Sequence, residues 1–174
     1  MTNENLIPAA INDYNVYANG RKLIGVGAEV SIPEIAQKTM ELNGSGIGGD
    51  LDMPIPGQFE SMEQELSFST VYSGFEEVIA QGQSFDLTLR AAQQVAGKDG
   101  TTKFVGLRIV ERGFVKKIAA GKVVRGEPME STVTAELSYI LIENNGKKLM
   151  EIDKLNGVHI VNGIDQMAAI RKHT

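Results

Sequence analysis

Cysteine is absent from this 174-residue chain, and only two histidines occur. Without cysteine, disulfide bonds, thiolate metal sites and cysteine nucleophiles are excluded. No G-x-S-x-G nucleophile elbow and no H-E-x-x-H zinc motif is present. His159 and His173 lie far apart and have no acidic neighbours at metal-ligand spacing, so we expect ordinary surface or hydrogen-bonded histidines. The sequence therefore predicts neither an enzyme nor a bound cofactor.

Positive charge is also in short supply. The 17 Lys and Arg residues are outnumbered by 22 Asp and Glu residues, which gives a formal net charge of −5. Proteins that bind DNA tightly concentrate Lys and Arg because phosphate contacts release counterions, so tight DNA binding is excluded. A modest negative charge is otherwise ordinary for a soluble protein.

Long apolar segments are missing as well. Hydrophobic residues make up 42% and charged residues 22%, close to the globular average, and composition gives no sign of a membrane span. Residues 1–10 do not resemble a secretory signal, so we expect the chain to remain in the cytoplasm where it is made. The length fits one domain, 1–174, with one core and no stable membrane insertion.

Short β-prone runs joined by tight turns dominate what is present. Asn19-Gly20 separates the runs 14–18 and 22–26, which predicts a hairpin, and Asp99-Gly100 and Asn145-Gly146 predict two more. The run 29–42 is ambiguous: Pro33 is compatible with a helix start, but we interpret the run as a strand. In 131–143 the side chains expected to share one face are Val133, Ala135, Leu137, Tyr139 and Leu141.

Residues 62–69 alternate cleanly, which predicts a half-buried strand with Glu63 and Glu65 facing water. A helix is predicted from Ser73 to a stop at Gly82. One good helix among many short strands favours a mainly β fold. We therefore expect two packed antiparallel sheets, a sandwich or barrel, with one flanking helix.

The run "LNGSGIGGDLDMPIPGQ" predicts a long glycine-rich loop at about 43–58. It lacks the lysine and spacing of a phosphate-binding loop, and Asp50 and Asp52 would repel phosphate. Its apolar side chains would be costly on a permanently solvated loop, so we expect them to dock onto another surface. The candidate contact residues are Gly44, Gly46, Ile47, Gly48, Gly49, Leu51, Met53 and Ile55.

The C-terminal third carries a family likeness. The run "STVTAELSYILIENNGKKLMEIDKLNGVHIVNGID" resembles the major tail tube proteins of contractile-tailed bacteriophages and phage-tail-like bacteriocins. The likeness extends to the early hairpin, to "IPEI", to the glycine-rich loop and to "IVERG", and it departs mainly at 85–103, where strand register is uncertain. The motif residues are Gly146, Lys147, Leu149, Glu151, Ile152, Asp153, Val161, Asn162, Gly163 and Asp165.

The resemblance implies a structural protein that assembles with itself. Subunits would form hexameric rings by continuing their sheets edge to edge, and the rings would stack into the hollow inner tube of a contractile tail. The loop would reach a neighbouring ring, with an N-terminal arm at about 1–12 and a C-terminal segment at about 157–174. The tube would conduct DNA or puncture a target cell envelope.

The resemblance also implies partners and a place. Besides itself, the chain would contact the tail sheath protein, a baseplate or tube initiator, a tail terminator and a tape measure protein, and DNA would pass without specific binding. It would belong to the virion tail and assemble in the bacterial host cytoplasm. From their polar strand faces, we interpret Glu63, Glu65 and Glu136 as lumen residues whose charge keeps DNA moving.

A different class remains open from the residues alone. A monomeric β-barrel could bind a small ligand, with the glycine-rich loop over its mouth. An acid-base hydrolase using Glu63 or Glu65 has no supporting constellation. Self-association as concentration rises would separate a tube subunit from a monomeric binding module.

Overall fold

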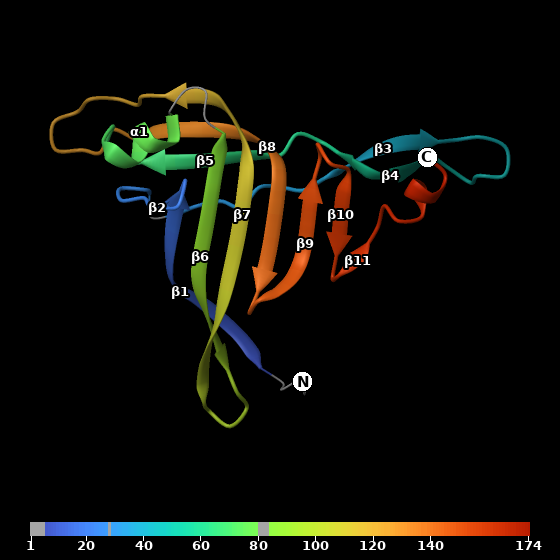
Figure 1. The fold of residues 1–174 in the computed structure, drawn as a ribbon, viewed down its shortest axis with the longest axis horizontal. Helices are drawn as coiled ribbons and strands as arrows, with labels where there is room; N and C mark the ends of the chain where they lie inside the picture. The colour runs from blue at the N-terminus through green and yellow to red at the C-terminus, as the bar shows by residue number, and fades with distance from the viewer. Residues whose placement is uncertain (1–5, 28, 80–83) are drawn as a thin grey trace.

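The computed structural model describes residues 6–27, 29–79 and 84–174. Figure 1 shows an elongated, mainly β molecule with one short α-helix in the described part of the chain. The elements are β1 (Ile7–Ala18), β2 (Arg21–Lys22), β3 (Gln37–Leu42), β4 (Leu51–Phe59), β5 (Glu63–Phe68), α1 (Ser73–Ile79), β6 (Phe85–Ala96), β7 (Thr102–Ala119), β8 (Ser131–Asn144), β9 (Lys147–Asp153), β10 (Val158–Val161), β11 (Ile164–Asp165) and the 3₁₀ turn η1 (Ile170–Lys172).

The strands form two antiparallel sheets of unequal size. The larger sheet has the order β11-β10-β9-β8-β7-β6-β1-β2, and β5 pairs with the first half of β8. The smaller sheet is the β3–β4 hairpin. The predicted class, mainly β with two antiparallel sheets and one helix, is confirmed.

Asn-Gly pairs make the tight turns between neighbouring strands. Asn19 and Gly20 have φ of 48° and 81°, and Asn145 and Gly146 have φ of 50° and 74°. Positive φ at both central positions is the requirement of a type I′ turn, which matches the twist of the flanking strands. Both predicted hairpins are confirmed, as is the one that turns at Asp99-Gly100.

A bulge bends β7 and β8 across the end of the larger sheet (Figure 1). Arg112 pairs with Tyr139 and Gly113 with Leu137, so Ser138 is the extra residue. A Cβ at position 113 would collide with the backbone of Glu136, so this close approach requires glycine. An upper layer therefore lies over the rest of the larger sheet; it consists of the last part of β7, the first half of β8 and β5.

The predicted inner face of β8 is wrong beyond this bulge. Val133, Ala135 and Leu137 face the core as expected, but Ile140 takes the next core position and Tyr139 does not. An extra residue reverses the alternation of a strand, which a period-two pattern cannot foresee. Tyr139 instead lies half-buried under the Arg112 guanidinium, 4.9 Å from ring centroid to Cζ.

The core lies between the upper layer and the rest of the larger sheet. The predicted face of 62–69 is confirmed, because Met62, Leu66 and Phe68 are buried while Glu63 and Glu65 are exposed. The helix expected from Ser73 is also confirmed, although its expected stop at Gly82 lies outside the described residues. No helix in the described part of the chain is long and apolar enough to cross a membrane.

Several segments project from the core. The β3–β4 hairpin extends at one end of the long axis, and the outer parts of β1, β6 and β7 extend away from the body (Figure 1). Residues 7–12, which the sequence analysis places in an arm, belong to β1 and pair with β6 from Ile7 opposite Ala96. Residues 30–36 have no regular structure, so the strand expected over 29–42 exists only from Gln37.

Candidate assembly surfaces

The glycine-rich segment is a hairpin with a short turn, and the predicted loop at 43–58 is too long. Only residues 43–50 connect β3 to β4, and Leu51, Met53 and Ile55 lie within β4. Prolines at positions 54 and 56 suggested a loop, but β4 pairs only with β3, and an edge strand tolerates proline. In the turn, Gly44 and Gly46 have φ of 147° and 94°, which other residues rarely adopt.

The hairpin presents apolar side chains to water. Ile47, Leu51 and Met53 expose 42%, 54% and 49% of their surface, while Ile55 is half-buried. A Cβ on Gly48 or Gly49 would meet no atom within 4 Å, so nothing within the described subunit requires glycine at these two positions. Exposed apolar residues gathered on one projection are typical of a surface that another protein covers.

The base of the hairpin is held by the C-terminal segment. Gly57 of β4 packs under the Met167 side chain, and the Phe59 ring meets the His159 ring edge to face at 5.0 Å between centroids. His159 is buried, so it is not the surface histidine that the sequence allowed, and its Nδ1 has no hydrogen-bond partner among the described residues. Burial lowers the pKa of His159, which favours the neutral ring.

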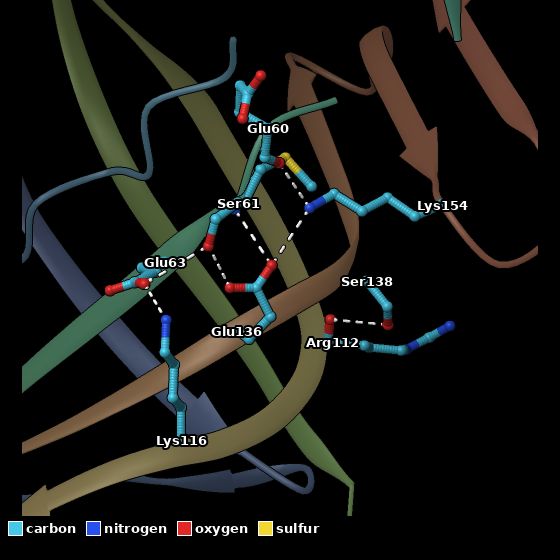
Figure 2. Close-up of polar contacts among 9 residues, drawn as sticks. Glu60, Ser61, Glu63, Arg112, Lys116, Glu136, Ser138 and Lys154 are labelled. Carbon is cyan, nitrogen blue, oxygen red and sulfur yellow. Dashed lines mark hydrogen bonds and ion pairs between the residues drawn. The ribbon is translucent and has the colours of Figure 1, made fainter. Parts of the chain in front are cut away.

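Two of the three proposed lumen acids lie together. Glu63 of β5 is directly opposite Glu136 of β8, and Figure 2 shows both carboxylates within one polar cluster. Glu136 accepts hydrogen bonds from Ser61 Oγ at 2.5 Å, from the Met62 backbone N–H at 3.3 Å and from Lys154 Nζ at 3.3 Å. Lys116 Nζ forms an ion pair with Glu63.

This cluster balances most of its own charge. Burial would raise the pKa of Glu136, but hydrogen bonds from Ser61 and Lys154 outweigh it, and the pKa lies below its ordinary value. The hydrogen bond to Glu63 raises the pKa of Lys116. Glu65 shares the exposed face of β5 and makes no ion pair within the described part of the chain. The sequence predicted the acids but not Ser61, Lys116 or Lys154, because these come from separate segments.

The C-terminal motif holds strands and turns in place. Glu151 accepts hydrogen bonds from Tyr139 Oη at 2.9 Å and from Lys148 Nζ at 2.5 Å, and the hydrogen bond from Lys148 is the main reason its pKa is lowered. Asp153 Oδ1 accepts the backbone N–H groups of Leu155 and Asn156 at 3.0 and 2.9 Å. These contacts close the turn from β9 into β10.

The rest of the motif continues this role. Gly146 occupies the β8–β9 turn, and Asn162 and Gly163, with φ of 50° and 82°, form the turn between β10 and β11. Asp165 accepts the Met167 backbone N–H at 2.9 Å and forms an ion pair with Arg171. The motif therefore organises the segment that supports the β3–β4 hairpin.

Two strand edges that the sequence did not single out are open. On its outer side β1 pairs with β2 at Tyr17 and Ala18, the Leu23 N–H donates to the Val16 carbonyl at 2.8 Å, and no described strand pairs with this side of residues 7–15. Pairing between β6 and β7 ends at Phe85 opposite Gly113, so residues 114–119 of β7 have a strand neighbour, β8, on one side only within the described chain. Unpaired N–H and C=O groups on such edges are templates for another strand.

A hollow large enough for a small ligand lies away from the β3–β4 hairpin. A surface hollow of about 550 Å³ is lined by residues of β1, β6, β7, β8 and the β8–β9 turn, Arg90, Phe104 and Arg108 among them, and by none from β3 or β4. No group of three or more metal-ligating side chains occurs among the described residues. This hollow therefore does not lie under the glycine-rich turn, where the ligand-binding alternative would place its ligand.

Known proteins resemble this chain over nearly its whole length. The family model for phage tail tube protein FII matches residues 8–174. The tail tube protein of Escherichia phage P2 is 28% identical over 170 residues, covering 96% of this chain and 97% of that protein. The major tail tube protein of Serratia phage KSP20 is 26% identical over 156 residues, with coverage of 88% and 87%.

A solved structure shares the fold. The cryo-EM structure titled as the sheath/tube terminator of an extracellular contractile injection system, PVC, in its extended state, superposes with a TM-score of 0.54 at 16% identity. The match covers 78% of this chain and 96% of that one. Since the family model spans almost all of the sequence, the chain belongs to the phage tail tube protein FII family and is a structural protein of the tail tube.

Proposed function

We propose that this protein builds its tube as stacked hexameric rings, in which the open edge of β1 pairs with a neighbouring subunit. The observation that carries the proposal is the length of this edge, residues 7–15, which the described chain leaves without a strand neighbour. Native proteins normally cover or interrupt such an edge because it invites pairing. Use of the edge within a ring would satisfy these backbone groups and give each subunit two neighbours.

The β3–β4 hairpin would link one ring to the next. The hairpin lies at one end of the long axis and away from β1 (Figure 1), and it carries exposed apolar side chains. Burying apolar surface contributes about 25 cal/mol per Å². Contacts repeated around a ring would therefore make stacking strongly cooperative.

The completed tube would conduct DNA or pierce a cell envelope. If the upper layer faces the lumen, Glu65 would carry uncompensated negative charge there, whereas Glu63 and Glu136 are paired with Lys116 and Lys154. Phosphate contacts would slow DNA, so an acidic wall would favour its passage. Sheath, initiator, terminator and tape measure proteins would be the partners, with assembly in the host cytoplasm.

The test is negative-stain electron microscopy of the purified full chain over rising concentration. We expect rings and hollow tubes, with sixfold symmetry in end views. A parallel sample of a charge variant on the outer face of β1, Ile11→Asp, is expected to retain the folded circular dichroism spectrum and to form fewer tubes. Monomers at every concentration, even after addition of preformed tube fragments, would contradict self-assembly.

A further inference from the structure

We propose that β3 of one copy pairs with the open edge of β7, residues 114–119, in a second copy. This inference rests on the proposed tube function, because it names the surface that receives the hairpin. The resulting contact would be head-to-tail and would continue the upper layer of one subunit into the hairpin of another.

The β7 edge has the features of an acceptor. After Gly113, β7 leaves β6 and continues to Ala119 with β8 as its strand neighbour in the described chain. Phe114 and Ile118 on this stretch expose 60% and 46% of their surface. An exposed strand edge that carries large apolar side chains is a site for strand addition.

Of the two hairpin strands, β3 is the suitable donor. Within the described chain it pairs with β4 alone, and it has six residues without proline, four of which are exposed. The unpaired stretch of β7 has the same length. β4 contains Pro54 and Pro56, which lack backbone N–H groups and interrupt any ladder on its outer edge.

The two segments are complementary in charge and in apolar character. From Gln37 to Phe59 the hairpin contains three acids, Glu41, Asp50 and Asp52, and one base, Lys38, so its net charge is negative. Residues 112–126, which include the β7 edge, contain five Lys or Arg residues and no acid. Lys117 and Arg125 are exposed and make no ion pair within the described part of the chain. Met40, 47% exposed, would meet Phe114 or Ile118.

The position of these segments requires a second copy. The hairpin and the last residues of β7 lie toward opposite ends of the long axis (Figure 1). One molecule cannot bring its own β3 to its own β7 edge without leaving its fold. Charge complementarity would also set the orientation, since two hairpins or two β7 edges would repel each other.

Cross-linking provides a direct test, because the natural chain has no cysteine to interfere. Single variants Glu41→Cys and Lys117→Cys are mixed and treated with a short bis-maleimide. We expect the mixed dimer to be the main cross-linked product and each variant alone to give little. The matched control replaces Lys117→Cys with Lys98→Cys, at an exposed position in the turn between β6 and β7, and should give no mixed dimer.

Charge exchange tests the same contact in assembly. Glu41→Lys and Lys117→Glu alone should each raise the concentration needed for tube formation at least tenfold, about 1.4 kcal/mol per contact. The double variant should recover most of the loss, while Lys98→Glu should behave like the natural protein.

The outcomes separate this inference from the proposed function. Tubes that form without the mixed dimer and without charge rescue would overturn the inference and leave the function standing. A mixed dimer without tubes would support the β3–β7 contact and contradict self-assembly. Neither dimer nor tube would overturn both.

Discussion

The core and the β3–β4 hairpin use the same kinds of side chain in opposite ways. Leu66 and Leu137 are fully buried between the two layers, whereas Leu51 and Met53 of the hairpin are about half exposed. Burial in the core stabilises the monomer, while the hairpin residues gain little until another surface covers them. The comparison separates residues whose burial stabilises the subunit from residues that, under the proposed function, become buried only on assembly.

A buried carboxyl group distinguishes the core from the hairpin. Glu111 lies in the core between Leu87 and Ile140 on the neighbouring strands, and its Oε2 has no hydrogen-bond partner among the described residues. Burial raises the pKa of Glu111 to about 8. Because the unfolded chain loses this proton near the ordinary pKa of 4.5, the free energy of unfolding should fall as pH rises from there to about 8.

The expected loss is several kcal/mol, at about 1.4 kcal/mol per pKa unit. Urea unfolding from pH 5 to pH 9 measures it. Glu111→Gln should flatten the profile and be more stable than the natural protein at pH 9, whereas Asp50→Asn in the hairpin should leave the profile unchanged. A natural protein with equal stability at pH 5 and pH 9 would show that Glu111 is not held neutral.

Leucine truncation should give the next largest difference. Leu137→Ala would leave a cavity in a site with no exposed surface, and we expect a loss of about 2–5 kcal/mol. Leu51→Ala, the same change in the hairpin, should alter the free energy of unfolding by less than about 0.5 kcal/mol. Thermal or urea unfolding of unassembled protein measures both, and equal losses would remove the distinction between the two regions.

Shortening the hairpin turn should separate folding from assembly. Deletion of residues 45–48 removes no residue of the core, so the melting temperature of the monomer should change little. Electron microscopy should show no stacked tubes. The matched control keeps the length of the turn and replaces Ser45 alone with alanine, which should preserve stacking. Normal tubes from the deleted chain would contradict the role of the hairpin.

The smallest effect is expected in the polar cluster of Figure 2. Glu136→Gln removes the ion pair with Lys154, which is partly exposed to solvent, so the free energy of unfolding should fall by less than about 1 kcal/mol at neutral pH. Since the pKa of Glu136 is lowered, this contribution should disappear as pH falls below the ordinary pKa. Unfolding at pH 7 and pH 3 measures the difference, and a larger effect at pH 3 would contradict the assignment.

Local sequence patterns predicted the elements that depend on nearby residues. Asn19-Gly20 and Asn145-Gly146 form turns because positive φ is readily available to asparagine and glycine. Alternation predicted the faces of β5 and the first half of β8. The pattern failed at Ser138, where the bulge depends on contact between β7 and β8, and at Pro54 and Pro56, where a proline-containing strand was mistaken for a loop.

The candidate surfaces were only partly predictable. The apolar residues of the hairpin stood out because nothing in a loop could bury them, and the C-terminal motif pointed to the family. Lys116 and Lys154 could not be assigned to Glu63 and Glu136 because the residues of each pair lie far apart in the chain. The open edges of β1 and β7 depend on where the neighbouring strands stop pairing with them. The alternation of residues within one strand carries no information about its neighbours.

The sequence alone determined the strand-rich class, the absence of cysteine chemistry, the glycine turns and the likeness to tail tube proteins, because these depend on residue type and short spacing. Only the tertiary structure decided the bend at Gly113, the burial of Glu111, the pairing of the acidic cluster and the strand edges left open. These features arise where segments distant in the chain meet, and their geometry is set by packing between strands rather than by any one segment.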